Sequence, residues 1–310
     1  MLISIIVPYH NREAFLTDTL RSFYTQTYRP IELLLVDNNS TDTSLQICQD
    51  FYQECNSETF KIRLLSAPSL GAAKARNIGL YKANGEYVYF FDSDDILSRD
   101  FLEDVNQYIL NNKGVDLIAC KTRMVYPSGE IKIRHGYYTK SIVDQILTGM
   151  LSTQSMVLKK DFLIAIGGWN NTLRKWDDWE LGVRVLKNNP SVGWIKNKAY
   201  HSIYQHTDSL TGSSFSERLD DTIQAINTVE NLVKESSKAI QSLLARKTIL
   251  AGYLWREKNT NKAEELFVEV LESSTSMLNG YLFKLLYLYI RIGGKGGWWL
   301  FRTFSFLWKD

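Results

Sequence analysis

Tyr89-Phe90-Phe91-Asp92-Ser93-Asp94-Asp95 is the stretch that decides the fold of this chain. An apolar and aromatic run begins at Tyr87, just after Gly85, and predicts a buried strand that ends at Phe91. Three carboxylates follow where this strand leaves the sheet, which is where open α/β sheets bind ligands. Carboxylates so close together need a cation, and oxygen ligands suit Mg²⁺ or Mn²⁺ held partly by a substrate's phosphates. The alternative is an Asp-rich turn that caps the next helix.

The size and composition of the chain exclude several classes of protein. Its 310 residues suffice for one large domain or for a domain with an appendage. The net charge of +2 gives no indication of nucleic-acid binding. The cysteines at 48, 55 and 120 match no zinc or redox spacing, so we expect a reducing compartment, the cytoplasm. The sequence has no signal peptide and no apolar run of about 18 residues, so we expect no transmembrane helix.

Short buried strands alternate with helices over the first hundred residues. We expect strands over 2–7, 31–36, 62–65 and 87–91, and helices over 13–24, from about residue 42, and over 71–80. Pro8 is expected to end the first strand. This alternation predicts an α/β fold, with a mostly parallel sheet and helices on both faces. A helix over 100–110, a strand over 115–120 and a hairpin over 123–135 follow.

The polar loops that follow the four strands converge on one edge of such a sheet. They run from Pro8 to Arg12, Asp37 to Ser40, Gly71 to Asn77 and Asp92 to Asp95. Carboxylates, cations and helix N-termini gathered there can bind a nucleotide. No G-x-G-x-x-G follows the first strand, which disfavours a nicotinamide or flavin cofactor, and no P-loop motif is present.

These loops resemble successive motifs of the family 2 glycosyltransferases, which have the GT-A fold. The matching segments are Val7 to Asn11, Val36 to Asp42, Gly71 to Gly79 and Asp92 to Asp95. The resemblance implies a nucleotide-diphosphate sugar donor, for which we expect a UDP-sugar, a divalent metal and inversion at the anomeric carbon. Asn38 departs from the pattern, since the family often has a second Asp there, and this leaves the base preference open.

The resemblance also implies roles for individual residues. Asp37 would contact the nucleobase, and Asp92 and Asp94 would form the D-x-D element for ribose and metal. Arg12, Lys74 and Arg76 are candidate cations for base or phosphate. The expected donor-binding residues are Pro8, Tyr9, Asn11, Arg12, Asp37, Asn39, Lys74, Arg76, Asn77, Asp92 and Ser93.

A second acidic cluster lies in Trp176-Asp177-Asp178-Trp179-Glu180-Leu181, after Gly167-Gly168-Trp169. Its carboxylates open a helix that we expect to end near Leu186, and a helix N-terminus stabilises and orients them. Partial burial between two indoles would raise their basicity, and transfer to a sugar hydroxyl needs a base. An N-cap with core tryptophans is the alternative.

This cluster also resembles the family's acceptor loop and its E-D catalytic pair. Asp178 matches the base, and Asp177, which stands where Glu is usual, is our second choice. Trp169, Trp176 and Trp179 would contact the acceptor. His206, which follows an expected strand over 199–204, matches a position that approaches the metal or diphosphate, although a structural role is equally open. His10 and His201 are expected to be structural.

The pattern changes after residue 215. We expect an α-helical C-terminal extension, with helices over 218–244 and 249–271. The segment 281–308 mixes aromatic and basic residues and is broken by paired glycines, so each piece is too short to span a bilayer. It suits a helix in the membrane interface, and packing on the catalytic domain or a dimer contact are the alternatives. We therefore expect a catalytic domain over 1–215, and a helical region over 216–310 that contacts the inner face of the membrane.

Together these features predict an inverting, metal-assisted glycosyltransferase with Mn²⁺ or Mg²⁺ as cofactor. The expected acceptor is a hydroxyl of a glycan or lipid-linked saccharide in the synthesis of a cell-surface polysaccharide. Two alternatives remain. A sugar nucleotidyltransferase should show a Gly- and Arg-rich loop after its first strand, which Pro8 to Arg12 is not. A non-enzymatic helical adaptor would not need the carboxylates at Asp177 and Asp178.

Overall fold

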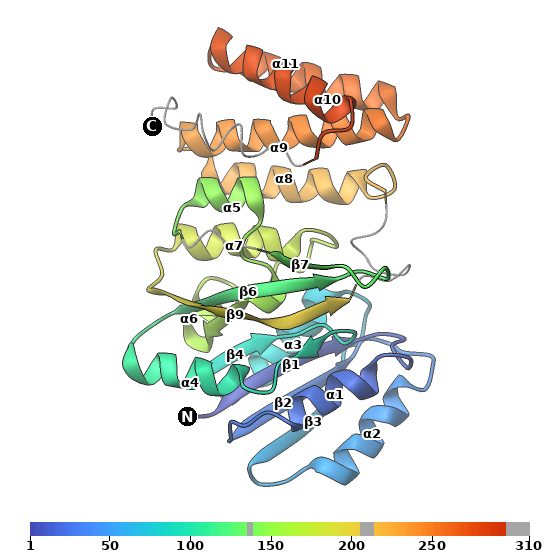
Figure 1. Ribbon diagram of the computed structural model, residues 1–310, viewed down its shortest axis with the longest axis vertical. Helices are drawn as coiled ribbons and strands as arrows, with labels where there is room; N and C mark the ends of the chain where they lie inside the picture. The colour runs from blue at the N-terminus through green and yellow to red at the C-terminus, as the bar shows by residue number, and fades with distance from the viewer. Residues whose placement is uncertain (135–138, 205–213, 296–310) are drawn as a thin grey trace.

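The computed structural model describes residues 1–134, 139–204 and 214–295 (Figure 1). The strands in these ranges are β1 (Ile3–Tyr9), β2 (Ile31–Asp37), β3 (Phe60–Ser66), β4 (Tyr87–Phe90), β5 (Ile96–Leu97), β6 (Leu117–Val125), β7 (Ile131–Arg134), β8 (Met156–Lys159) and β9 (Val192–Tyr204). The helices are α1 (Leu16–Tyr24), α2 (Ser44–Cys55), α3 (Ala72–Lys82), α4 (Phe101–Asn111), α5 (Ile142–Thr148), α6 (Lys160–Ala165), α7 (Asp177–Lys187), α8 (Leu219–Val233), α9 (Ser237–Arg256), α10 (Thr260–Glu272) and α11 (Met277–Arg291), with a 3₁₀ turn η1 (Thr153–Ser155).

The strands form one sheet in the order β3-β2-β1-β4-β8-β6-β9-β5, with β7 paired to β6. The first four strands are parallel, with Ile5 of β1 level with Leu33 on one side and Tyr89 on the other. Every residue of β1 is buried, as expected for a parallel strand covered on both faces. This confirms the prediction of a mostly parallel sheet. Strand β8 then enters antiparallel between β4 and β6 and connects the two halves.

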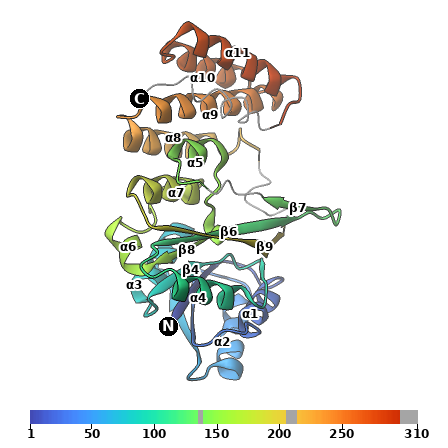
Figure 2. The same cartoon turned by 60° about the vertical axis from the view of Figure 1, so that its left-hand side comes forward.

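Helices cover both faces of the sheet and build two cores. Helices α1, α2 and α4 pack on one face through Leu20, Cys48 and Phe101, and α3, α6 and α7 cover the other. Helices α8 to α11 form a further stack on α5 and α7 (Figures 1 and 2). A shared cluster that includes Trp179 of α7 and Ile226 of α8 joins this stack to the sheet-containing part.

Two of the expected boundaries are wrong. Strand β1 continues through Pro8 to Tyr9, because Pro8 lies beyond the last pairing between β1 and β4 and pairs only with β2. The N–H that Pro8 lacks therefore removes no hydrogen bond between β1 and β4. The strand expected over 199–204 is the end of the longer strand β9, which pairs with β6 past a register shift at Cys120.

The helices of the C-terminal region also break at positions other than those expected. The helix expected over 218–244 is two helices, because Ser236 caps α9 by accepting a hydrogen bond from the backbone N–H of Ala239. The helix expected over 249–271 is also split, since α9 continues to Arg256 and the chain turns at Lys258, whose φ is +66°. Of the segment 281–308, the structure describes α11 and the residues up to 295.

Within the described ranges, no helix combines the length and apolar character needed to cross a membrane. The three cysteines are unpaired and buried.

A buried, hydrogen-bonded series of side chains, Tyr89, His201 and Cys120, lies under the strand ends. It leads us to expect that the folded protein is less stable in acid. His201 is fully buried, with Nδ1 2.9 Å from the Tyr89 hydroxyl and Nε2 3.2 Å from the Cys120 sulfur. Burial lowers the pKa of His201 from 6.5 to about 3. Below about pH 6.5, His201 binds a proton in the unfolded chain but not in the folded chain. The free energy of unfolding therefore falls as the pH drops.

We expect the free energy of unfolding to fall by about 2 kcal/mol between about pH 7 and pH 5 because of this histidine. Urea unfolding across this pH range measures the slope in the wild type and in His201→Gln, whose side chain does not titrate. The absolute stability of the variant is not the readout. Parallel stability curves for the two proteins would show that His201 binds its proton equally well in the folded and the unfolded chain, and this would contradict the prediction.

Candidate active site

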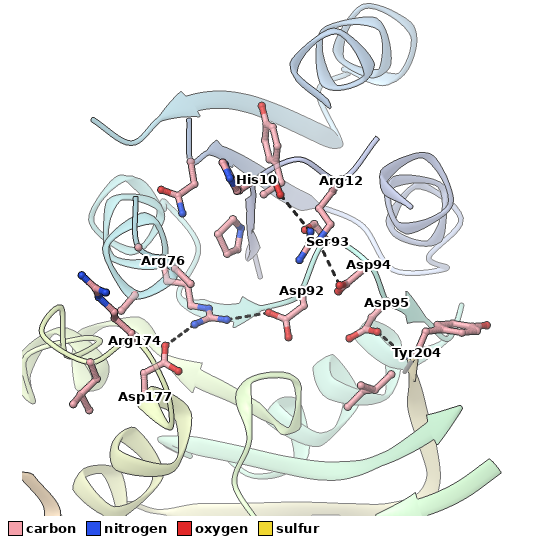
Figure 3. Close-up of a pocket in the computed structure, with 18 residues that line it drawn as sticks. His10, Arg12, Arg76, Asp92, Ser93, Asp94, Asp95, Arg174, Asp177 and Tyr204 are labelled. Atoms are coloured by element: carbon pink, nitrogen blue, oxygen red, sulfur yellow. Dashed lines mark hydrogen bonds and ion pairs between the residues drawn. The ribbon is translucent and has the colours of Figure 1, made fainter. Parts of the chain in front are cut away.

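The carboxyl ends of the first strands surround a pocket of about 410 Å³, which we call the strand-end pocket (Figure 3). Four of the expected loops and the start of α7 contribute to its wall. Its lining residues are Pro8, Tyr9, His10, Arg12, Asn38, Gly71, Ala72, Ala73, Arg76, Asp92, Ser93, Asp94, Asp95, Leu173, Arg174, Asp177, Ile203 and Tyr204. The loops expected to converge therefore do converge, and they do so at the sheet edge where α/β folds bind ligands.

The three carboxylates after β4 have different surroundings. Asp92 is paired with Arg76 at 3.0 Å, and Asp94 with Arg12 at 3.4 Å. Withdrawal from water raises the pKa of Asp92, and Arg76 offsets part of this increase. Asp95 is almost fully buried, accepts a hydrogen bond from the Tyr204 backbone N–H at 2.8 Å, and is also bound by the Gln154 amide. Burial raises the pKa of Asp95 to about 9.

Arg76 connects the two acidic clusters of the sequence. Its guanidinium bonds Asp92 at 3.0 Å and Asp177 at 2.7 Å, and it lies 4.5 Å from the centre of the Trp169 ring (Figure 3). Only 8% of this side chain is exposed, so the pairing takes place largely out of water. The pKa of Arg76 is raised, because the attraction of Asp177 and Asp92 outweighs the effect of burial. This one side chain therefore holds β4 and α7 at a fixed separation.

The two carboxylates that open α7 are held differently. Asp177 lines the pocket, and burial raises its pKa to about 6 despite the neighbouring Arg76. Asp178 is half-buried beside the pocket, and its oxygens accept backbone N–H groups of Trp179 at 2.7 Å and Thr153 at 3.4 Å. Trp176 precedes them with φ +56°, a left-handed conformation that turns the chain into the helix.

The expected acceptor tryptophans do not line the strand-end pocket. Trp169 is buried against Phe90, and Trp179 is buried with its indole N–H donating to the Ile146 carbonyl at 3.2 Å. These two side chains pack the core and support the pocket from behind. Trp176 faces the helical region, where the Arg246 guanidinium lies 4.4 Å from its ring centre.

Several other predicted residues brace the loops instead of lining the pocket. Asn11 accepts the Thr41 backbone N–H at 2.8 Å, and Asp37 accepts that of Ser40 at 3.1 Å, while Asn39 takes the left-handed φ of +62°. The first two loops are thereby tied together beside the pocket. Lys74 lies at the exposed surface, where it donates to Ser69.

Asn77 fixes the glycine loop from behind. Its amide donates to the Trp169 carbonyl at 2.8 Å and accepts the Trp169 backbone N–H at 2.8 Å. A Cβ on Gly168 would lie 2.6 Å from the Asn77 oxygen, and φ there is +65°. Only glycine fits this approach without strain, which explains the Gly-Gly-Trp sequence.

The pocket also contains residues that are absent from the predicted sets of donor-, metal- and acceptor-binding residues, among them His10, which was expected to be structural. His10, Asn38, Asp95, Leu173, Arg174, Ile203 and Tyr204 all line it. Leu173 and Arg174 lie between the two motifs of the second cluster, and Tyr204 ends the strand before His206. Their closeness in the sequence to predicted site residues is the signal that could have identified them. His206 itself lies outside the described residues.

A second cleft of about 410 Å³, the hairpin cleft, adjoins the strand-end pocket and shares Asp94 and Tyr204 with it. The loop between β6 and β7 forms one wall and the start of α1 the other. Its remaining lining residues are Ala14, Phe15, Asp18, Ile96, Val125, Tyr126 and Pro127.

The donor set after β4 fits a divalent metal only together with a ligand. Among the described residues, no group of three His, Cys, Asp or Glu side chains is placed to hold a metal by itself. Mg²⁺ and similar ions in nucleotide sites, however, take one or two carboxylates and complete their shell with phosphate oxygens and water. Asp92 and Asp94 supply such a pair at the pocket floor, so the residues fit a metal that arrives with a diphosphate.

Comparison with known structures identifies the fold as GT-A. The structure resembles the crystal structure of S. aureus TarS 1-349 in complex with UDP-GlcNAc, with a TM-score of 0.68 and 21% identity, covering 98% of this chain and 90% of that one. It also resembles the mannosyltransferase PcManGT from Pyrobaculum calidifontis in complex with GDP-Man and Mn²⁺, with a TM-score of 0.59 and 16% identity, covering 99% of this chain and 87% of that one.

The sequence places the chain more narrowly. The family model described as glycosyl transferase family 2 matches residues 4–179, more than half of the chain. The protein belongs to glycosyl transferase family 2. An uncharacterized glycosyltransferase of Haemophilus influenzae is 41% identical over 36% of this chain and 43% of its own length. Glycosyltransferase GlyG of Streptococcus pneumoniae is 37% identical over 38% of each chain, so these matches span less than half of the relatives.

Proposed function

We propose that this protein is an inverting glycosyltransferase that moves a sugar from a UDP-sugar to a hydroxyl of a glycan or lipid-linked saccharide. The observation that carries the proposal is that one pocket contains both acidic clusters, Asp92 to Asp94 on one side and Asp177 on the other, joined by Arg76. Family membership supports the reaction class, and the similarity to TarS, whose complex contains UDP-GlcNAc, supports the uridine nucleotide.

The donor is proposed to lie along the strand ends. Pro8, Tyr9 and Asn38 line the part of the pocket assigned to the nucleoside, and Asp37 at the end of β2 is proposed to contact the base. Arg12 supplies positive charge beside Asp94, where the diphosphate would lie. Asp92 and Asp94 would hold Mn²⁺ or Mg²⁺ together with the donor phosphates, which would stabilise the charge that develops on the departing diphosphate. A role for His206 in this site stays a prediction.

The proposed chemistry is a single in-line displacement. The acceptor oxygen forms a bond to the anomeric carbon as the bond from that carbon to the diphosphate oxygen breaks, which inverts the configuration. The acceptor proton passes to Asp178, as its match to the family's base implies. Asp177 is already committed to Arg76 at 2.7 Å, whereas within the described contacts Asp178 accepts two backbone N–H groups, one of them at 3.4 Å. Asp177 is therefore assigned to holding Arg76.

The reacting hydroxyl of the acceptor is proposed to enter the strand-end pocket on the side of Asp177, where Leu173 and Arg174 line the wall, since the base Asp178 must reach it. The hairpin cleft meets the pocket on the opposite side, at Asp94 and Tyr204, and its Phe15 and Tyr126 offer flat apolar faces of the kind on which sugar rings pack. This proposal replaces direct contact by Trp169 and Trp179, which are buried. We propose residues 1–215 as the catalytic unit, 216–310 as its helical support, and the cytoplasm as the place of action.

Incubation with UDP-GlcNAc and other UDP-sugars in Mn²⁺ tests the function directly. Release of UDP is expected for sugar transfer or for slow donor hydrolysis without acceptor. A parallel incubation with UTP and a sugar 1-phosphate tests the nucleotidyl reaction, which would release pyrophosphate as the UDP-sugar forms. No release from any nucleotide sugar, with no donor binding, would leave a non-enzymatic adaptor.

Asp94→Asn is expected to weaken donor binding in Mn²⁺ by about tenfold or more, because one charged metal ligand is lost. Titration calorimetry with UDP, with and without Mn²⁺, measures this. Asp50→Asn, a change at an exposed carboxylate of α2 that bonds Gln46, is the matched control. Equal affinities in Mn²⁺ for Asp94→Asn and the wild type would remove Asp94 from the metal site.

A further inference from the structure

Helix α11 is apolar on two opposite faces. Phe283, Leu286 and Ile290 are buried against α9, and Gly252 of α9 permits the close approach, since a Cβ there would lie 2.6 Å from Ile290 Cβ. The opposite face carries the side chains that we call the α11 outer stripe: Met277, Leu278, Tyr281, Leu285, Leu288 and Ile292. From Leu278 onward their spacings of three and four residues place them along one line of the helix.

The outer stripe is an unusual concentration of exposed apolar surface. It contains six of the sixteen large hydrophobic side chains that are exposed in the described part of the chain, and Met277 is 85% exposed and Ile292 76%. The others are distributed over elements from α1 to α10. Scattered hydrophobic residues need no explanation, but a continuous apolar face marks a contact surface. Helix α11 forms the outer end of the molecule in both views, and neither view shows another helix or strand of the described residues over it (Figures 1 and 2).

The charges of this region select the kind of contact. From Ser273 to Lys309 the sequence contains no Asp or Glu, while Lys284, Arg291, Lys295, Arg302 and Lys309 are basic. The residues that follow α11 continue this composition, with Trp298, Trp299, Phe301 and Trp308 among them. Lys284 is exposed and one turn from Leu288, and its ammonium lies 5.8 Å from the Tyr281 ring centre. Long basic side chains beside apolar and aromatic ones suit a lipid interface.

The neighbouring helix α10 carries four glutamates, and two of them are paired with lysines. Its Glu269 points to the buried Lys247 of α9 at 2.6 Å, and Glu265 pairs with Lys262 at 2.7 Å. A second copy packed on the outer stripe would bring basic residues against basic residues. An anionic lipid surface complements both the apolar stripe and its cations.

We propose that the α11 outer stripe docks this protein on an anionic phospholipid bilayer, with Leu285 and Leu288 in the acyl boundary and Lys284 at the headgroups. The proposal does not depend on the catalytic activity, since lipid binding is measured without donor or acceptor.

Flotation of the full-length protein with phosphatidylcholine vesicles, with and without phosphatidylglycerol, tests the proposal. We expect binding to the anionic vesicles that weakens as NaCl rises from about 0.1 M to about 1 M, where the Debye length falls from about 10 to about 3 Å. Leu285→Glu is expected to lower the partition coefficient by about tenfold or more, since an apolar contact is lost and a like charge is added.

Leu110→Glu is the matched control, because Leu110 of α4 is 59% exposed and Leu285 is 61% exposed. This variant adds the same charge far from α11 and is expected to bind vesicles as the wild type does. Equal binding by Leu285→Glu and Leu110→Glu would overturn the proposal, as would the absence of wild-type binding to anionic vesicles. A wild-type dimer in light scattering that Leu285→Glu dissociates, without vesicle binding, would assign the stripe to a second copy.

Discussion

Asp178→Asn is expected to lower kcat by about 10³-fold and to leave the affinity for UDP unchanged, because a general base contributes about 10² to 10⁴ to the rate. The substitution keeps the shape of the side chain and removes its proton acceptor. Turnover of the donor that proves best in the UDP-sugar screen gives kcat, and calorimetry with UDP gives the affinity. A near-wild-type kcat in this variant, with donor binding intact, would remove the base assignment from Asp178.

Asp177→Asn is the comparison that separates the two neighbouring carboxylates. Loss of the Asp177 charge should release the Arg76 guanidinium. Because Arg76 also holds Asp92 at 3.0 Å, donor binding should change as well as turnover. Asp177 is charged above its pKa of about 6 and neutral below it. In the wild type we therefore expect kcat/KM to fall as the pH drops through about 6, and this limb should disappear in Asp177→Asn. A limb unchanged in Asp177→Asn would belong to another group.

The sequence predicted the first four strands and the convergence of their loops because each strand is a continuous apolar run with a polar end. Strand β8 and helices α5 and α6 escaped prediction because they are short, and the four residues of β8 carry no recognisable period. The tryptophans illustrate another limit. An indole beside a carboxylate looks the same in sequence whether it faces a ligand or the core, and only the packing against Phe90 and Ile146 decides it.

Pairings between distant side chains were equally beyond the sequence. Arg76 and Asp177 are separated by about a hundred positions, and the helix spacing around Arg76 does not reveal that it points at two carboxylates. The motif therefore suggested a phosphate-binding cation, whereas the structure places Arg76 between acidic groups. Asp95 shows the same limit, because its burial follows from the position of Tyr204 at the end of β9.

Arg76→Met is expected to lower the free energy of unfolding by about 3 to 5 kcal/mol, the usual cost of removing one partner from a buried ion pair. Methionine keeps much of the volume over Trp169, so the loss comes mainly from the charge. Asp92 and Asp177 would then face each other without a cation, and the pKa of Asp177 should rise above about 6. Urea unfolding at neutral pH measures the change. Lys262→Met, which removes the partner of Glu265 in an ion pair exposed on both sides, is the control and should leave the free energy of unfolding close to that of the wild type.

The double variant Arg76→Met with Asp177→Asn distinguishes charge from packing. If the cost of Arg76→Met comes from stranded carboxylates, neutralising one of them should recover about 0.5 to 3 kcal/mol, the range of coupling between residues in one network. If the cost comes from lost packing over Trp169, the second substitution should add its own destabilisation and recover nothing.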